Sequence, residues 1–271
     1  MGDSVSYCCP SVLPGLVLGQ GRFSRFEFGR HYHLDYHVGV VTQGRQLQRL
    51  CGSASLLGPG NVSIVPPDEI HDGSPDDEAG YSLRTFRITP ELYREWMHVS
   101  QESDRVVSAK PVVRDDPLLA QRLSRLHAYF ATGQTAGIDM LAEEQATDLQ
   151  NLLVRLISGL PAISDDRILS RGQWNAVHDY CQERLAERIS LDDLAAVCEL
   201  SRFQFLRHFK RTHGGITPHE WLLRRRLEVA CRKIRQGGRS MAQIAAECGF
   251  FDQSHFARHF RRTYGVAPSC Y

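Results

Sequence analysis

An internal repeat near the end of the sequence constrains the fold of this chain more than any other feature. The segment RHFKRT at residues 207–212 returns as RHFRRT at residues 258–263, an offset of 51 residues. Upstream, LAAVC at 194–198 returns as IAAEC at 244–248, an offset of 50 residues. Self-similarity at a fixed period is the sequence signature of a repeated supersecondary unit. Residues 173–271 are therefore expected to contain two copies of one helical motif.

Each copy is expected to be a helix-turn-helix. Ser190 and Ser240 stand at N-cap positions, and each precedes a short segment with two alanines that allow close packing. A tight turn follows, and Ser201 and Asp252 then cap a second helix. In DNA-binding proteins of this type the second helix lies in the major groove. The pattern therefore indicates two DNA-reading helices in one chain.

The outer faces of these two second helices carry groups that can read DNA. Helical phase places two phenylalanines of each copy on an inner face, and the opposite faces contain no Asp or Glu. Arg can bind guanine in bidentate fashion, Gln can bind adenine, and apolar side chains can contact a thymine methyl group. Lys210 and Arg261 are expected to hold phosphates. The outer positions are Arg202, Phe203, Leu206, Arg207 and Lys210 in the first copy, and Gln253, Ser254, Ala257, Arg258 and Arg261 in the second.

One long helix is expected between the two copies, over Pro218–Gln236. A rigid helix would fix the distance between the reading helices, and successive major grooves on one face of DNA lie about 34 Å apart. We therefore expect one chain to cover two adjacent major-groove segments. Several arginines stud this helix, and Arg225 among them is expected to hold a phosphate.

The charge of the chain is unevenly distributed. Lys and Arg total 32 against 31 Asp and Glu, so the formal net charge of +1 gives no sign of a nucleic-acid partner. Residues 171–271 nevertheless contain 17 basic and 10 acidic side chains, a net of +7, whereas residues 1–170 contain 15 and 21, a net of −6. Such asymmetry points to nucleic acid or a membrane surface as the partner of the basic part. The repeat favours double-stranded DNA.

The first part of the chain is expected to form a small β-barrel or jelly roll with appended helices. Short strand-like segments at 36–42, 46–51, 62–65 and 82–88 alternate with Gly and Pro turns, and 72–80 is expected to be a polar loop. Amphipathic helices are expected at 90–99, 117–130 and 138–157, and their apolar stripes fit either a core or a dimer face. The sequence thus predicts an α+β chain of two domains, with a front domain at 1–160, a linker at 161–172 and an all-α double helix-turn-helix at 173–271.

Several function classes receive no support from the sequence. No apolar run approaches the roughly 18–20 residues of a membrane-spanning helix, and no secretory signal is evident at the N-terminus. The eight cysteines form no CxxC pair. No nucleophile–base constellation or Gly-rich phosphate loop is visible either. We expect a cytoplasmic protein with reduced cysteines, no cofactor, no membrane contact and no catalytic activity.

The repeated region, taken together, resembles the DNA-binding domain of the AraC/XylS family of bacterial transcription regulators. The resemblance rests on the segments at 189–195, 201–210, 221–227, 244–250, 252–256, 260–262 and 265–268, and on Tyr271. It implies two helix-turn-helix units, activation of transcription together with RNA polymerase, and an N-terminal sensory domain that binds a small-molecule effector and can form a homodimer. It also implies base contacts from Phe203, Leu206, Arg207, Ser254, His255 and Arg258.

Histidines in the front domain follow the spacing of cupin barrels. His31, His33, His37 and Gly44 match HxH-x3-E-x6-G with His in place of Glu, and His71 ends a second cupin-like motif. Imidazole suits Zn, Fe, Cu or Ni, so these side chains could form a metal site in a barrel mouth. Because the sensory domains of AraC-type regulators resemble cupins, we expect the four histidines to line an effector pocket without metal. A cupin-type metal-binding enzyme or metal sensor remains the alternative.

Overall fold

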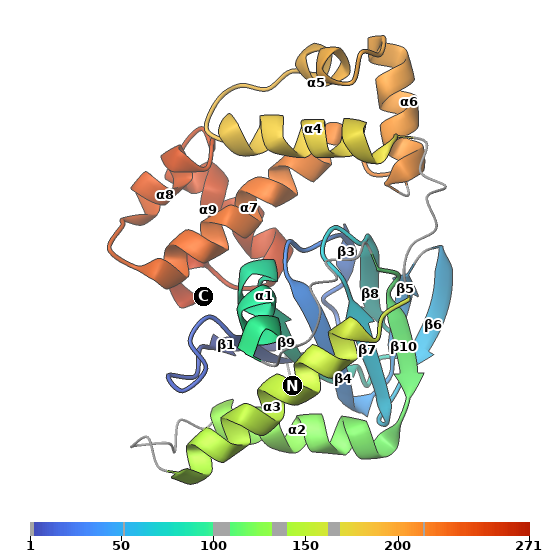
Figure 1. The fold of residues 1–271 in the computed structure, drawn as a ribbon, viewed down its shortest axis with the longest axis vertical. Helices are drawn as coiled ribbons and strands as arrows, with labels where there is room; N and C mark the ends of the chain where they lie inside the picture. Colours follow the sequence, from blue (N-terminus) through green and yellow to red (C-terminus); the bar gives the residue numbers. More distant parts are fainter. Residues whose placement is uncertain (1–2, 51, 100–108, 132–139, 162–168, 214) are drawn as a thin grey trace. The chain divides into compact units, whose positions relative to one another are not determined.

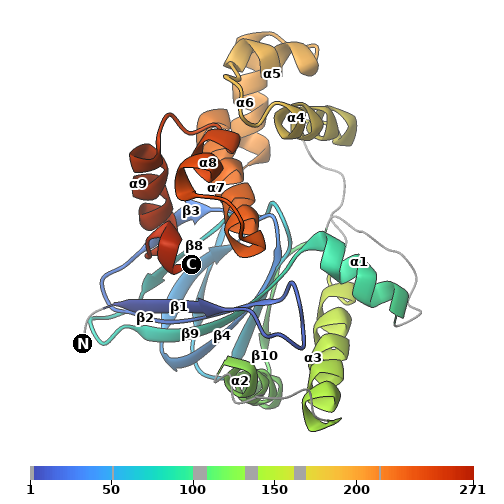
Figure 2. The same cartoon turned by 90° about the vertical axis from the view of Figure 1, so that its left-hand side faces the viewer.

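The computed structural model describes residues 3–50, 52–99, 109–131, 140–161, 169–213 and 215–271. The chain divides into two units, Met1–Ile163 and Ser164–Tyr271. The first is rich in β-strands and the second is helical (Figures 1 and 2). The predicted α+β class, with a β-rich front and a helical double helix-turn-helix, is thereby confirmed. No helix in the described ranges is long and apolar enough to cross a bilayer.

The first unit contains two antiparallel sheets. A six-stranded sheet has the order β1-β2-β9-β4-β7-β10, and a four-stranded sheet has the order β3-β8-β5-β6. Sheets of this kind, with neighbours far apart in sequence, form the jelly-roll type of barrel. The strands are β1 (Ser4–Cys8), β2 (Val17–Phe23), β3 (Phe28–His31), β4 (Tyr36–Gly44), β5 (Gln46–Leu50), β6 (Ser53–Leu57), β7 (Asn61–Val65), β8 (His71–Pro75), β9 (Tyr81–Ile88) and β10 (Val112–Asp115).

The larger apolar core of this unit lies between the six-stranded sheet and three helices. These helices are α1 (Pro90–Val99), α2 (Pro117–Ala131) and α3 (Met140–Ser158). Alternate residues such as Val38, Val40 and Phe86 turn to this side and are at most 1% exposed. Figure 2 shows α2 and α3 on the side of the sheet away from the four-stranded sheet. Most of the apolar burial of this unit therefore lies between the sheet and the helices. The interior between the two sheets is left free to hold polar side chains.

The space between the two sheets is mixed in character. A small apolar cluster of Phe23, Val41, Leu57 and Tyr81 occupies part of it. The remaining inward positions are largely polar. They include His37, Ser63 and Arg87 on the six-stranded sheet and Gln46, Gln48 and His71 on the four-stranded sheet.

The second unit consists of six α-helices, with a terminal 3-10 turn at Pro268–Cys270, in the range that the structure describes. The helices are α4 (Arg171–Glu183), α5 (Leu191–Val197), α6 (Arg202–Thr212), α7 (Pro218–Gln236), α8 (Met241–Glu247) and α9 (Gln253–Tyr264). The four predicted N-caps at Ser190, Ser201, Ser240 and Asp252 each accept a hydrogen bond from the backbone of the helix that follows. The long helix has the predicted bounds.

Most predicted elements of the first unit are confirmed, but one is wrong. The segment 72–80 does not form a loop throughout, because β8 (His71–Pro75) pairs with β3 and β5. Its inward residues are His71 and Gly73, which face a polar interior, so the strand lacks apolar alternation. Strands β1 and β2 were also not expected, since both contain Ser or Gly at several positions.

The predicted linker at 161–172 falls mostly on residues 162–168, which lie outside the described residues. Its last part belongs to the helical unit. Leu169 is fully buried, and Ser170 caps α4 with a capping box that includes Gln173. Helix α4 therefore starts two residues before the predicted domain boundary at 173.

Candidate nucleic-acid interface and histidine cluster

Helix α6 is anchored through its inner face. Phe205 and Phe209 are fully buried, and the ring of Phe209 lies 6.0 Å from both Trp174 of α4 and Trp221 of α7, between ring centroids. Ser201 Oγ accepts a hydrogen bond of 3.3 Å from the Gln204 amide, and the Gln204 side-chain oxygen accepts one of 3.1 Å from the Ser201 amide. This capping box and the aromatic cluster hold one face of the helix inward.

The opposite face of α6 is open to solvent. Arg202, Phe203, Arg207 and Lys210 are exposed and Leu206 is half-buried. The Phe203 ring is 84% exposed, although a phenyl group prefers burial. Arg202 forms a 3.8 Å ion pair with Asp192 of α5, in which both side chains remain largely exposed.

Helix α9 repeats this arrangement. Phe256 and Phe260 are fully buried, and Asp252 accepts a 2.6 Å hydrogen bond from the His255 amide. Gln253, Ser254, Arg258 and Arg261 are exposed and Ala257 is half-buried. His255 differs from these, because its ring packs 5.6 Å from Phe250 and 4.6 Å from His259 between centroids. Its imidazole is therefore partly covered.

The two turns share equivalent backbone hydrogen bonds but differ in length by one residue. The amides of Leu200 and Phe250 bond to the carbonyls of Ala195 and Ala245, at 3.0 and 2.9 Å. Both turns contain a residue with positive φ, Glu199 at 55° in the first copy and its counterpart Gly249, at 77°, in the second. Phe251 then precedes the N-cap of α9 as an additional residue and is 92% exposed. This insertion explains why the repeat offset changes from 50 to 51.

The phosphate contact expected for Arg225 is not supported by the structure. Its side chain is 1% exposed, its Nη2 atom donates a 2.9 Å hydrogen bond to Oε1 of Gln182, and its guanidinium lies over the Trp221 ring. A DNA phosphate cannot reach a group enclosed in this way. The sequence could not reveal this, because the covering side chains come from α4, more than 40 residues earlier.

Two neighbouring arginines of α7 also have structural contacts. Arg224 pairs with Glu228 at 3.6 Å, and Glu228 accepts a 2.5 Å hydrogen bond from the hydroxyl of Tyr264 on α9. Arg226 donates to the carbonyls of Leu185 and Glu187 at 3.1 and 2.7 Å. The basic centre of α7 thus joins α7 to α4, to the segment before α5 and to α9.

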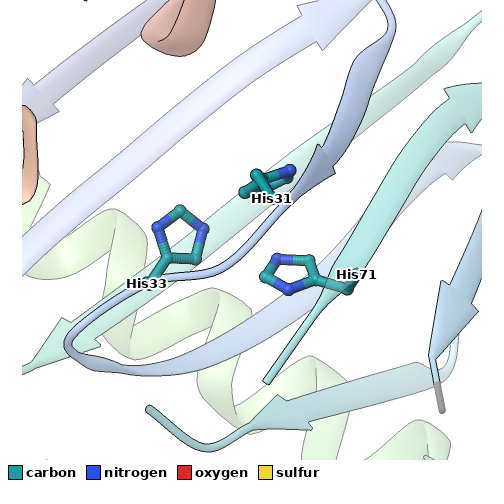
Figure 3. A group of neighbouring side chains, drawn as sticks. All are labelled: His31, His33 and His71. Atoms are coloured by element: carbon teal, nitrogen blue, oxygen red, sulfur yellow. The ribbon is translucent and has the colours of Figure 1, made fainter. Parts of the chain in front are cut away.

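Three of the four predicted histidines meet at one end of the barrel interior. The nitrogens of His31, His33 and His71 that could bind a metal all lie within 4.8 Å of one another. Figure 3 shows their rings around a common space, with His31 from the end of β3, His33 from the segment after it and His71 from the start of β8. His37 does not belong to this group. Its ring instead stacks on that of His33, at 3.9 Å between centroids and 15° between planes.

Further polar groups near this cluster were missed by the sequence reasoning. Arg87 on β9 pairs with Asp35 at 3.0 Å, both at most 2% exposed, and Arg87 is the β-sheet partner of His37. Gln48 on β5 is 5% exposed, and its Oε1 atom has no hydrogen-bond partner among the described residues. The spacing of Gln46, Gln48 and Leu50 at every second position was the signal that could have found it.

A cavity of about 400 Å³ lies elsewhere in the first unit. Residues of β1, β2, β4 and β9 line it, among them Gln20, Arg22, Ser82 and Arg84. None of the four histidines contributes to its wall. Three consecutive residues of β9, Ser82, Leu83 and Arg84, contribute to it, so both faces of this strand take part in its wall.

Comparisons with known proteins agree with this architecture. Residues 13–149 match the AraC-like ligand binding domain, and residues 194–271 match a helix-turn-helix domain. The MmsAB operon regulatory protein of Pseudomonas aeruginosa is 28% identical over 94% of this chain and 80% of its own length. The transcriptional activator RhaS of Yersinia pestis is 26% identical over 98% and 96% of the two chains. The probable transcriptional regulator LumQ of Photobacterium leiognathi is 35% identical, over 56% of this chain and 60% of LumQ.

The fold of the whole chain is also similar to a solved structure. Apo ToxT from Vibrio cholerae superposes with a TM-score of 0.61 at 16% identity, over 94% of this chain and 96% of ToxT. At this identity the likeness is one of fold alone. The family is shown by the two domain matches, which together cover most of the sequence. With two helix-turn-helix units behind an AraC-like ligand binding domain, the chain belongs to the AraC family of DNA-binding transcription regulators.

Proposed function

We propose that this chain is an effector-responsive transcription activator that reads two adjacent major-groove segments through α6 and α9. The observation that carries this proposal is the repeated outer face. Each helix is fixed by two fully buried phenylalanines and an N-cap, and each turns an exposed face without acidic residues to solvent. A face without carboxylates can approach the DNA backbone without charge repulsion.

Base contacts are assigned to the first part and middle of each outer face. Arg207 and Arg258 are suited to bidentate bonds with guanine, and Gln253 to adenine. Phe203 and Leu206 offer apolar contact to thymine methyl groups, and Ser254 and His255 complete the second set. Arg202, Lys210 and Arg261 are assigned to phosphates. Arg225 is left out because it is buried.

Helix α7 is suited to hold the two units at a fixed separation. It has 19 residues and is therefore about 28 Å long. It packs on α4 and α6 through Trp221 and on α8 and α9 through Leu227 and Ala230. Helices that occupy successive major grooves are about 34 Å apart. A connecting helix of this length therefore suits one chain that contacts two adjacent grooves.

The front domain is proposed to bind a small effector between its two sheets. The support is the polar interior near His31, His33, His37 and His71, which gives an effector several hydrogen-bonding partners. ToxT of Vibrio cholerae has been solved with an unsaturated fatty acid bound. Here imidazole and amide side chains favour a polar effector instead. Binding would shift the population between conformations that differ in DNA affinity or activation. The proposal includes no catalytic step.

Two further partners belong to this proposal. The relatives named RhaS are activators, and an activator at a promoter acts on RNA polymerase. A homodimer is supported by Leu118 on α2 and Leu141 on α3, which are 80% and 53% exposed. Pairing of two chains would place four reading helices on one DNA site.

Selection of binding sites from random DNA by the full-length chain tests the proposal. The expected consensus has two parts whose centres are about 10–10.5 base pairs apart. Arg207→Ala should relax one part and Arg258→Ala the other. Arg125→Ala removes the same charge from an exposed position on α2 and should leave both parts unchanged. A consensus with a single part, or one that neither variant alters, would contradict direct reading by both helices.

A further inference from the structure

The rings of three histidines lie close together, which an effector pocket by itself does not require. The centroids of the His31 and His71 rings are 4.2 Å apart, those of His31 and His33 are 4.8 Å apart, and those of His33 and His71 are 5.1 Å apart. The three rings thus form a small triangle around one point (Figure 3). We propose that His31, His33 and His71 form a binding site for one divalent transition-metal ion.

Backbone contacts orient two of the rings for this role. Nδ1 of His31 lies 2.6 Å from the Gly29 carbonyl oxygen, and Nδ1 of His71 lies 3.0 Å from that of Glu69. A carbonyl oxygen only accepts, so each Nδ1 carries the proton and donates it. Nε2 then carries the lone pair. Metal-binding histidines are usually held in this way, with the second ring nitrogen bonded to a carbonyl or carboxylate that fixes the tautomer.

The donor set determines the class of ion. Three neutral imidazoles suit Zn²⁺, Ni²⁺, Cu²⁺ or Fe²⁺, whereas Mg²⁺ and Ca²⁺ prefer oxygen ligands. Metal–nitrogen bonds of about 2.0–2.1 Å place two ligand nitrogens at most about 4.2 Å apart. One ring nitrogen of each of the three histidines lies within 4.8 Å of those of the other two. The proposal therefore requires the side chains to rotate until these nitrogens come within the limit that the metal–nitrogen bonds set.

The surroundings of the cluster permit an added positive charge. Arg87, the strand partner of His37, is a buried cation on the same face of its sheet, and it is already paired with Asp35 at 3.0 Å. His37 stacks flat on His33 and so supports that ring from behind without pointing at the same centre. His33 and His71 are each 6% exposed and His31 is half-buried. The site is thus sheltered but reachable from the side of His31.

A site with three histidines leaves coordination positions for a further ligand. Gln48 turns to the same interior from β5, on the same face of the sheet as Leu50, the strand partner of His71. Its buried Oε1 atom has no hydrogen-bond partner among the described residues. A metal-bound water that donates a hydrogen bond would give this atom a partner. The metal site goes beyond the proposed reading of DNA and does not depend on it.

Metal titration of the full-length chain tests this inference. The protein is first freed of metal with a chelator, and Co²⁺ is then added while its visible absorption bands are recorded. Isothermal titration with Zn²⁺ gives the number of bound ions and the affinity. The wild-type chain should bind one ion, with Co²⁺ bands typical of nitrogen ligands.

Three variants decide whether the cluster holds the ion. His31→Ala should weaken binding by at least about tenfold, the loss that follows even when only a residue supporting a metal ligand is changed. His98→Ala is the matched control, because His98 is exposed on α1 of the same unit, and it should bind like the wild type. His71→Gln is the second test, and thermal unfolding of each variant without metal shows whether it is folded.

Each result of these measurements either supports or overturns the metal site. His31 is the least buried of the three ligands, so His31→Ala gives a result even if His71→Gln does not fold. Wild-type protein that takes up no Co²⁺ or Zn²⁺ at micromolar concentration would overturn the inference, as would unchanged affinity in folded His31→Ala. Since DNA site selection needs no metal, its result is independent of this one.

Discussion

The Arg225 guanidinium on α7 donates a 2.9 Å hydrogen bond to Oε1 of Gln182 on α4. This contact joins the helix that links the two DNA-reading units to the first helix of the same domain. His178, one turn before Gln182, lies against the same guanidinium, with 3.5 Å between Nη2 of Arg225 and Nδ1 of the ring. Burial and the neighbouring Arg225 charge lower the pKa of His178. The imidazole of His178 is therefore neutral beside the Arg225 guanidinium.

Arg225→Ala is therefore expected to destabilise the helical unit and not to remove a phosphate contact. Loss of a buried charge-assisted hydrogen bond and of the stacking on Trp221 should cost about 2–4 kcal/mol of unfolding free energy. Urea unfolding followed by tryptophan fluorescence measures it, since Trp174 and Trp221 lie in this unit. Normal stability together with uniformly weaker binding to all DNA sequences would instead restore the phosphate role.

Substitution of Arg207 and substitution of Arg258 should weaken DNA binding by similar amounts, each at a different base position. Arg207→Ala and Arg258→Ala are each expected to cost about 1–3 kcal/mol of binding free energy at the selected site and to relax base preference at one position. Fluorescence anisotropy with the selected site and with variants of it at each position gives these values at fixed salt. An equal loss on random DNA would show that the two side chains hold phosphates.

Lys210 and Arg261 provide the matched contrast. Either one changed to Ala should weaken binding about equally on specific and random DNA and should reduce the salt dependence by about one released counterion. Binding measured over a series of salt concentrations gives this slope. A changed consensus in either variant would mean that it contacts a base.

Local signals explain which parts of the fold could be predicted. The caps at Ser190, Ser201, Ser240 and Asp252, and the 3.6-residue period of α6, α7 and α9, depend on neighbours in sequence. Arg225 and β8 depend on distant neighbours. Arg225 looks exposed until α4 covers it, and β8 looks like a loop until its partners β3 and β5 place His71 and Gly73 in a polar interior.

The histidine cluster was predictable only in part, for the same reason. The spacing of His31, His33 and His37, together with the second motif that ends at His71, indicated that these four side chains could converge. The structure brings His31 and His33 to His71, while His37 stacks on His33. Side chains two apart on a strand share a face, but His33 lies beyond the end of β3 and His37 within β4. Where the chain turns between strands, spacing alone cannot give ring orientation.

The turn of the first helix-turn-helix offers a stabilising substitution. Glu199 adopts a φ of 55°, where an L residue is strained, and its counterpart Gly249 adopts 77°. Glu199→Gly should raise the unfolding free energy by up to about 1 kcal/mol, because glycine has no side chain that resists this conformation. Glu199→Ala keeps the strain and is the control. Thermal unfolding that is no higher in the glycine variant than in the alanine variant would contradict this account.

Stability of the first unit should fall as the pH is lowered, and His127 is the reason. Its ring is fully buried on α2, and Nε2 lies 2.9 Å from the carbonyl oxygen of Gly19 on β2. Burial lowers the pKa of His127 from 6.5 to about 4, so the folded state holds the neutral form and Nε2 donates to the carbonyl. The unfolded chain takes up a proton near pH 6.5, before the folded chain does.

Linkage then fixes the sign of the effect. The stability that the neutral ring contributes is complete above about pH 6.5 and is lost as the pH falls toward about 4, where both states are protonated. The loss over this interval is expected to be about 3 kcal/mol, because the pKa of His127 falls from 6.5 to about 4 on folding. Urea unfolding at a series of pH values measures it. His127→Gln retains a donor for Gly19 but cannot titrate, so its unfolding free energy should change less over this range. An equally steep loss in His127→Gln would assign the acid sensitivity to other groups.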